Sequence, residues 1–209
     1  MPKWIRNNGL SLSMFVLFAV SLTGQILAGE REYNSDQQEH GQPATNISGY
    51  LRSAHFVEAV FENWESEFLQ MGSFVLLTAW LYQQGSPESR KLQGEPDLDK
   101  DPRRAKKGDS PWPVQRGGLI LTFYEHSLSL ALFLLFAISF LLHAAGGARE
   151  YSQDQIEHGQ SAVSMFEYLR TSRFWFESFQ NWQSEFLSVG VLIVLSIFLR
   201  ERRSPESKP

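Results

Sequence analysis

The chain contains no cysteine. This absence excludes a disulfide framework, a thiolate nucleophile and any metal site with cysteine ligands. Charge is absent from two long stretches, residues 10–28 and 128–145, which are almost wholly apolar and about as long as a helix that spans hydrocarbon. The scarcity of charge in these stretches predicts a membrane protein, and we expect the lipid bilayer to be its principal partner.

Motifs of known catalytic chemistry are also missing. The chain has no glycine-rich phosphate loop, no serine nucleophile elbow, no Glu-x-x-His and no zinc-ligand spacing. Its basic residues are dispersed and interleaved with acidic ones, which argues against a nucleic-acid partner. The sequence therefore favours a non-enzymatic protein and indicates no particular cofactor.

The main feature of the sequence is a long internal repeat. When the sequence is shifted by 118 residues, 10–90 aligns with 128–208, and 37 of the 81 aligned positions are identical. A repeat of this length is a whole structural unit used twice. We expect repeat 1 to cover 1–90, a linker to cover 91–117 and repeat 2 to cover 118–209.

Each repeat is predicted to contain two spans. The first spans cover about 10–28 and about 119–145. The first of these could pass for a secretory signal because Lys3 and Arg6 precede it, but its mid-chain copy favours retention. The later apolar runs, 68–82 and 186–199, are too short to cross alone, so those spans are extended upstream to about 63–82 and 180–199. The predicted fold is therefore an all-α membrane protein of four transmembrane helices, formed by two parallel two-helix repeats with a pseudo-two-fold along the membrane normal.

Basic residues divide unevenly among the connecting segments. The two tails and the segment 83–117 hold fourteen Lys and Arg, whereas the loops 29–55 and 146–173 hold five. The positive-inside rule places both termini in the cytoplasm and the two loops outside. We expect a multi-pass protein of the cell inner membrane.

The extended spans carry polar residues to membrane depth. Depth alone predicts an outer polar layer made of Gln25, Glu67, His143 and Glu185. Ionisable groups at this depth face protein or water and mark ion or proton pathways. The alternative is that tilt or snorkelling leaves both glutamates at the headgroup level.

Acidic and histidine residues also recur in both outer loops. If 31–42 and 149–160 are helical, the first two acids and the histidine of each copy fall at i, i+4 and i+8 on one face, and the third acid lies beside them. Carboxylates and imidazole at such spacing can hold a divalent metal, and the candidate ligands are Glu32, Asp36, Glu39, His40, Glu150, Asp154, Glu157 and His158. The alternative is a salt-bridged cap neutralised by Arg31, Arg52, Arg149 and Arg170. Gly41 and Gly159 are predicted to end these helices.

The repeated motifs Arg-Glu-Tyr-x-x-Asp-Gln-x-Glu-His-Gly-Gln, Asn-Trp-x-Ser-Glu-Phe-Leu and Ser-Pro-Glu-Ser resemble an uncharacterised family of bacterial inner-membrane proteins. The resemblance covers nearly the whole chain except the linker. It implies a bacterial inner membrane and carries no mechanism.

Three functions stay open at this point. The leading prediction is a structural or partner-binding membrane protein. The second is a small proton- or ion-coupled transporter that uses the polar layer, and the third is a metal-binding membrane protein. Four spans are few for a monomeric transporter, so a homodimer or another protein partner remains an alternative.

Overall fold

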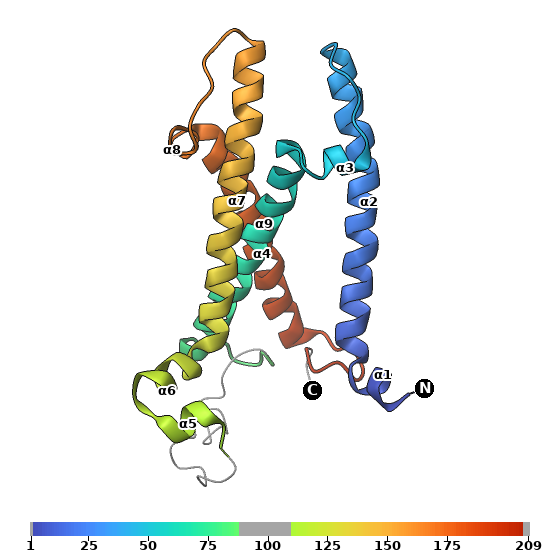
Figure 1. Cartoon of the computed structure of the whole chain (residues 1–209). Coiled ribbons are helices and arrows are strands. Elements are labelled where there is room, and N and C mark those ends of the chain that lie inside the picture. Colours follow the sequence, from blue (N-terminus) through green and yellow to red (C-terminus); the bar gives the residue numbers. More distant parts are fainter. Residues whose placement is uncertain (1, 88–109, 207–209) are drawn as a thin grey trace. The chain divides into compact units, whose positions relative to one another are not determined.

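The computed structural model describes residues 2–87 and 110–206. Within these ranges the chain is helical and contains no strand (Figure 1). The predicted all-α class is thereby confirmed. The helices are α1 (Lys3–Asn7), α2 (Gly9–Glu39), α3 (Ile47–Tyr50), α4 (Ala54–Trp80), α5 (Trp112–Arg116), α6 (Gly118–Glu125), α7 (Ser127–Glu157), α8 (Met165–Tyr168) and α9 (Ser172–Phe198).

The helix bounds recur along the chain. α2, α3 and α4 begin and end 118 residues before α7, α8 and α9, which is the shift that aligns the two copies of the sequence. Most of the linker lies outside the described residues, as do Glu88, Ser89 and Ser207 of the Ser-Pro-Glu-Ser motifs. The limits of the repeats and their pseudo-two-fold relation remain predictions.

Three helices of the described chain are long and apolar enough to cross a membrane, namely α2, α7 and α9. α4 is not among them, although it has the same 27-residue length as α9. The difference follows from composition, because the first half of α4 carries Glu58, Glu62, Glu65 and Glu67. Whether α4 crosses the membrane is thus the central question of the topology.

Burial is inverted relative to a water-soluble domain. Among the described residues, the buried side chains are seven apolar and eight polar ones, whereas large apolar side chains are exposed along α2, α4, α7 and α9. Soluble proteins rarely expose extended apolar surface, and helices in lipid bury their polar groups against one another. This distribution is typical of a membrane protein.

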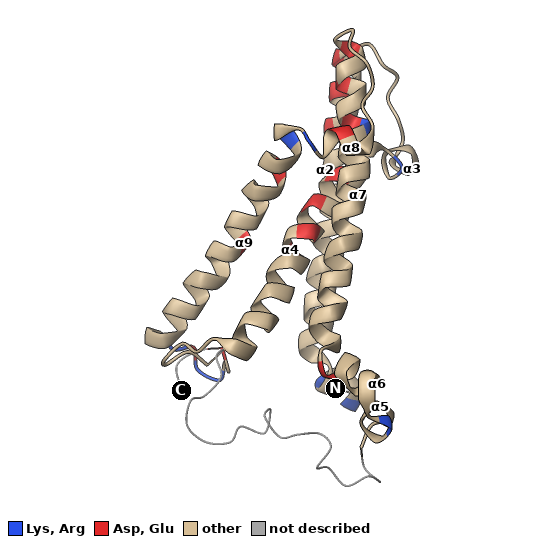
Figure 2. Cartoon of the chain, turned by 90° about the vertical axis from the view of Figure 1, so that its left-hand side faces the viewer, with Lys and Arg blue, Asp and Glu red and all other residues tan. Residues whose placement is uncertain are grey.

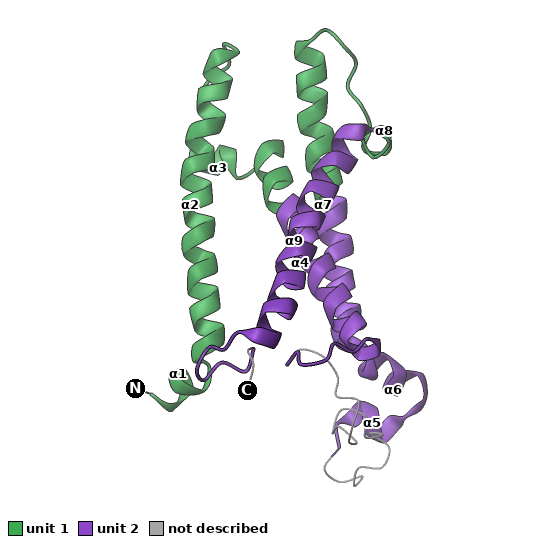
Figure 3. Ribbon diagram, turned by 180° about the vertical axis from the view of Figure 1, so that it is seen from behind, with its two compact units in different colours: residues 1–60, 142–170 green, residues 61–141, 171–209 purple. Residues whose placement is uncertain are grey.

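The chain divides into two compact units (Figure 3). Unit 1 is made of residues 1–60 and 142–170, and unit 2 of residues 61–141 and 171–209. Each unit therefore draws residues from both copies of the repeat. α4 and α7 contribute residues to both units.

In unit 1 the same packing occurs twice. Tyr50 and Tyr168, which occupy matching positions, are 1% and 0% exposed. A Cβ added to Gly29 would collide with the Tyr50 ring, and one added to Gly147 would lie 2.5 Å from the Tyr168 hydroxyl oxygen. Each tyrosine of the short helices thus fits against a glycine on the long helix of its own copy.

The loops that follow α2 and α7 are held by the same kind of hydrogen bond. The Asn34 side chain bonds both backbone groups of Thr45, at 2.8 and 2.7 Å. In the second copy the Ser152 hydroxyl does the same for Val163, at 3.0 Å in each direction. Different side chains therefore make the same link between a long helix and the loop that follows it.

The observed helix ends match those predicted from the sequence at Gly41 and Gly159 and differ from the prediction at His126. Gly41 and Gly159 follow the ends of α2 and α7 with φ of 71° and 74°, so the predicted breakers are confirmed. The span expected at 119–145 is instead divided between α6 and α7 at His126. The Ser129 hydroxyl donates to the His126 carbonyl at 3.0 Å, which satisfies a backbone group at the break.

Unit 2 is held by aromatic packing between α7 and α9. Phe174 is fully buried, and its ring centroid lies 5.2 Å from that of Phe140 and 5.4 Å from that of Trp175. Edge-to-face ring pairs of this kind add to the gain from burial. On α4, Gly72 approaches Leu132 and Phe133 of α7, with 3.4 Å between an added Cβ and either side chain.

Candidate functional site: the acidic face of α4

Three glutamates follow one face of α4. Glu58, Glu62 and Glu65 are spaced at i, i+4 and i+7, which places them on the same side of a helix. Figure 2 shows acidic residues on α4 in red. Glu58 is 8% exposed, Glu65 is fully buried, and Glu62 is half-buried. We call these three residues the acidic face. His55 lies one turn earlier on the same side.

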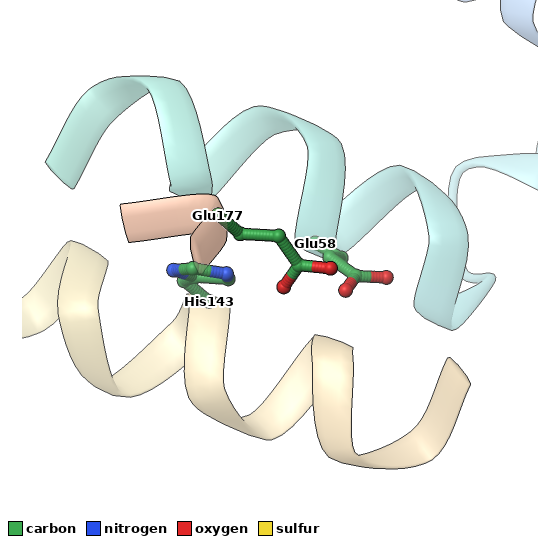
Figure 4. Close-up of side chains that lie close together, drawn as sticks. All are labelled: Glu58, His143 and Glu177. Carbon is green, nitrogen blue, oxygen red and sulfur yellow. The ribbon is translucent and has the colours of Figure 1, made fainter. Parts of the chain in front are cut away.

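Glu58 belongs to unit 1 and meets residues of the second copy there. The Tyr168 hydroxyl donates a hydrogen bond of 3.3 Å to Glu58 Oε1. The fully buried His143 presents a ring nitrogen within 4.8 Å of a Glu58 carboxylate oxygen, and Figure 4 shows these two side chains together. A carboxylate, an imidazole and a phenol are thus gathered inside unit 1.

Close approach of α4 and α7 makes this cluster. A Cβ added to Gly146 would lie 2.7 Å from the backbone nitrogen of Glu58, so only glycine fits at this position. Ala144 and Ala148 beside it are buried as well. Small residues let two membrane helices approach closely, and here they bring the backbone of Glu58 against α7.

Glu62 and Glu65 belong to unit 2, where they meet the second Asn-Trp pair of the repeat. The Asn181 amide donates to Glu62 Oε1 at 2.6 Å, and the Trp182 indole N–H donates to Glu65 Oε1 at 3.0 Å. The two hydrogen bonds join α4 to α9. Each carboxylate of the acidic face therefore accepts a hydrogen bond from an uncharged side chain.

The acidic face occurs in one copy only. The positions that match Glu58, Glu62 and Glu65 are Phe176, Gln180 and Gln183. The Asn-Trp pair, in contrast, is kept in both copies. The two second helices have therefore diverged, with the carboxylates on α4 and two uncharged amides on α9.

The structure places the predicted polar layer as follows. In unit 1, His143 is fully buried, whereas Gln25 is exposed on α2. In unit 2, Glu67 is exposed and Glu185 is half-buried, and the two carboxylates lie close enough to interact electrostatically. A role for these four residues as one layer remains a prediction.

The predicted metal ligands lie at the exposed ends of α2 and α7, in unit 1. His40 Nε2 is 4.0 Å from Glu157 Oε2, which brings the two copies together. Within each copy the histidine Nδ1 is near the preceding aspartate, at 3.5 Å for His40 and Asp36 and 3.3 Å for His158 and Asp154. In the described chain no three of the eight predicted ligands gather at the spacing of a metal site. Metal binding there remains a prediction.

A third histidine of unit 1 also lies near a carboxylate. His55 Nε2 lies 3.5 Å from Glu32 Oε2. Within residues 2–87 and 110–206, none of Arg31, Arg52, Arg149 and Arg170 has a carboxylate within 4.0 Å. A hydrogen bond to the Asp36 carbonyl raises the pKa of His40, and the charges of Asp36 and Glu157 raise it further.

Sequence reasoning missed the acidic face because it placed the start of the second span at Asn63. Counting back from the apolar run by the thickness of hydrocarbon left Glu58 and Glu62 outside the span. A signal was available: three acids at i, i+4 and i+7 indicate a helix with a carboxylate stripe. The stripe predicts that the helix begins before Glu58, and it begins at Ala54.

The chain belongs to the family described as Domain of unknown function (DUF6766), whose family model matches residues 1–209. The resemblance read from the motifs, to an uncharacterised family, is thereby confirmed. Comparisons with curated proteins and with solved structures gave no match.

Proposed function

We propose that the protein is a four-span inner-membrane protein that takes up and transfers protons at the acidic face of α4. Its three apolar helices support membrane insertion. α4 adds 27 residues, about 40 Å at 1.5 Å per residue, which exceeds the thickness of hydrocarbon. The excess of Lys and Arg in the tails and the linker supports cytoplasmic termini.

One observation carries the proposed activity. Glu58 and Glu65 are buried carboxyl groups on a helix of a membrane protein, and each accepts a hydrogen bond from an uncharged side chain. Carboxyl groups at membrane depth are rare because they are costly, and they mark proton or ion pathways. A phenol and an indole N–H can stabilise either form of a carboxyl group without adding positive charge.

The spacing of the ionisable residues on α4 supports proton transfer along this helix. His55, Glu58, Glu62 and Glu65 lie one turn apart in succession, about 5 Å along the axis for each step. Carboxyl and imidazole groups in such a series can exchange protons directly or through water. His143 adds an imidazole beside Glu58.

A structural or partner-binding role is the second candidate. The bonds from Asn181 to Glu62 and from Trp182 to Glu65 join two helices, as polar residues commonly do in membranes. In that case the carboxylates act as acceptors, and their titration has no role. The matching helix bounds of the two copies support a pseudo-two-fold arrangement under either function.

Replacement of carboxylate by amide separates the two functions. Glu58→Gln, Glu65→Gln and the double variant keep an acceptor oxygen and remove the titrating group. Purified protein in liposomes with an entrapped pH dye would be given a proton gradient. The exposed Glu206→Gln serves as the matched control.

We expect the double variant to keep its helix content and melting temperature and to lose proton flux at least tenfold, while the control keeps it. A wild-type protein without flux above that of empty liposomes would contradict proton transfer. So would a double variant with wild-type flux. The structural role would then be tested with Glu65→Leu, which removes the acceptor and should lower the melting temperature.

A further inference from the structure

A cavity of about 330 Å³ lies between α4 and α9 within unit 2. Gln70 and Phe74 of α4, Tyr82 of the segment after it, and Phe186 and Gly190 of α9 are among the residues that line it. This volume falls at the lower end of the range for small-molecule sites. The cavity is separate from the acidic face, since none of the three glutamates lines it.

The described residues of the lining are uncharged. None of the twelve that line the cavity carries a formal charge, and most of them are apolar. A phosphate or carboxylate ligand would be desolvated among these twelve residues without a compensating cation, which is unfavourable. The cavity is therefore suited to an uncharged molecule with an apolar body.

Gln70 supplies a polar group to the lining of the cavity. Its side chain is 5% exposed, lines the cavity, and makes no hydrogen bond with any residue in 2–87 or 110–206. A ligand in the cavity that bonds this amide would gain a hydrogen bond that the described residues do not make. The amide has two donor hydrogens and an acceptor oxygen, so a ligand that carries a carbonyl oxygen would satisfy it.

Gly190 keeps the cavity open. A Cβ added to Gly190 would meet nothing within 4 Å, whereas the matching Gly72 is packed against α7. Gly72 therefore permits close approach of two helices, whereas Gly190 has open space beside it. The position that matches Gln70 is Ser188, so the polar group of the cavity also belongs to one copy.

From these observations we infer that the cavity binds an uncharged lipid whose carbonyl oxygen accepts a hydrogen bond from the Gln70 amide. The apolar chain of the lipid would lie along Phe74 and Phe186. Such a carbonyl is present in neutral acylglycerols and in quinones, and both dissolve in the bilayer. The proposal does not depend on proton transfer by the acidic face.

Native mass spectrometry of the purified protein, in an uncharged detergent without ester groups, tests this inference. The probes are dioctanoylglycerol, its dioctyl ether without carbonyls, and a quinone with a decyl chain. Three variants accompany the wild type. Gln70→Leu removes the amide, Gly190→Phe fills the cavity, and Leu192→Phe is the control because it lies exposed on α9 outside the cavity.

We expect a carbonyl probe to bind at least fivefold more tightly than the ether. Gln70→Leu should remove this preference, Gly190→Phe should abolish binding, and Leu192→Phe should change neither. Whichever carbonyl probe binds more tightly identifies the source of the ligand. Equal binding of ester and ether, or an unaltered preference in Gln70→Leu, would overturn the proposal, as would the absence of binding by every probe. Circular dichroism of each variant separates lost binding from lost folding.

Discussion

The Tyr168 hydroxyl donates a hydrogen bond of 3.3 Å to the carboxylate of Glu58, 110 residues earlier in the chain. Both side chains are buried, and each belongs to a different copy of the repeat. The hydrogen bond therefore joins the two copies within unit 1. It also gives the carboxyl group at the start of the acidic face a defined orientation.

Tyr168→Phe should destabilise the protein by about 1–3 kcal/mol, because Glu58 loses the hydrogen bond from the Tyr168 hydroxyl inside the unit. Glu58→Gln should cost less, since the amide oxygen still accepts. Thermal unfolding of Tyr168→Phe, of Glu58→Ala and of their double variant gives the interaction energy between the two positions, since each of these changes removes the hydrogen bond. Additive effects would show that the hydrogen bond does not contribute to stability.

Gly147→Ala should lower the free energy of unfolding by about 1–3 kcal/mol, because the added methyl group overlaps the Tyr168 ring. Gly24→Ala is the matched control, since an added Cβ there meets nothing within 4 Å on the same kind of long helix. We expect the control to be neutral or slightly stabilising. A Gly147 variant as stable as the control would contradict the packing of Tyr168 against this glycine.

The pH dependence of stability should include a contribution from His40. The pKa of His40 is raised in the folded state, so the favourable interaction of its protonated ring with Asp36 and Glu157 is fully present below the ordinary histidine pKa of about 6.5. It is lost as the pH rises through the raised value.

His40→Asn should therefore lower the melting temperature at pH 5.5 more than at pH 8.5. Measurement of the melting temperature at both values checks this. Equal effects at the two pH values, or a larger effect at pH 8.5, would show that protonated His40 does not stabilise the ends of α2 and α7.

The helical class and several helix ends could be predicted from sequence because they depend on local features. Long uncharged runs require helices in lipid, and Gly41 and Gly159 adopt the positive φ that ends a helix. A helix around Asp36 was the condition under which its acids and histidine share a face, and α2 extends through Glu39.

The acidic face could not be predicted by the same reasoning, since that reasoning measured spans by hydrocarbon thickness. α4 extends nine residues before Asn63, and those residues include Glu58 and Glu62. Which of two neighbouring carboxylates is buried also depends on tertiary contacts. Glu65 is buried and Glu67 is exposed because Trp182 meets the face that carries Glu65.

Two glycines at matching positions also show that tertiary contacts cannot be predicted from the sequence alone. Gly72 and Gly190 occupy matching positions, yet one lies against α7 and the other lines a cavity. Sequence identity between copies predicts equal backbone conformation more securely than equal surroundings. The surroundings depend on neighbours such as Phe133, which belong to other parts of the chain.

The proposal of four spans with cytoplasmic termini requires α4 to cross the membrane. Single-cysteine labelling tests this central claim most directly. The chain has no cysteine, so Gln42→Cys, Gln160→Cys and Ser110→Cys can each be read without background. An impermeant maleimide applied to intact spheroplasts should label the first two variants and should label Ser110→Cys only after lysis. Labelling of Ser110→Cys in intact spheroplasts together with Gln42→Cys would place both ends of α4 on one side and contradict the claim.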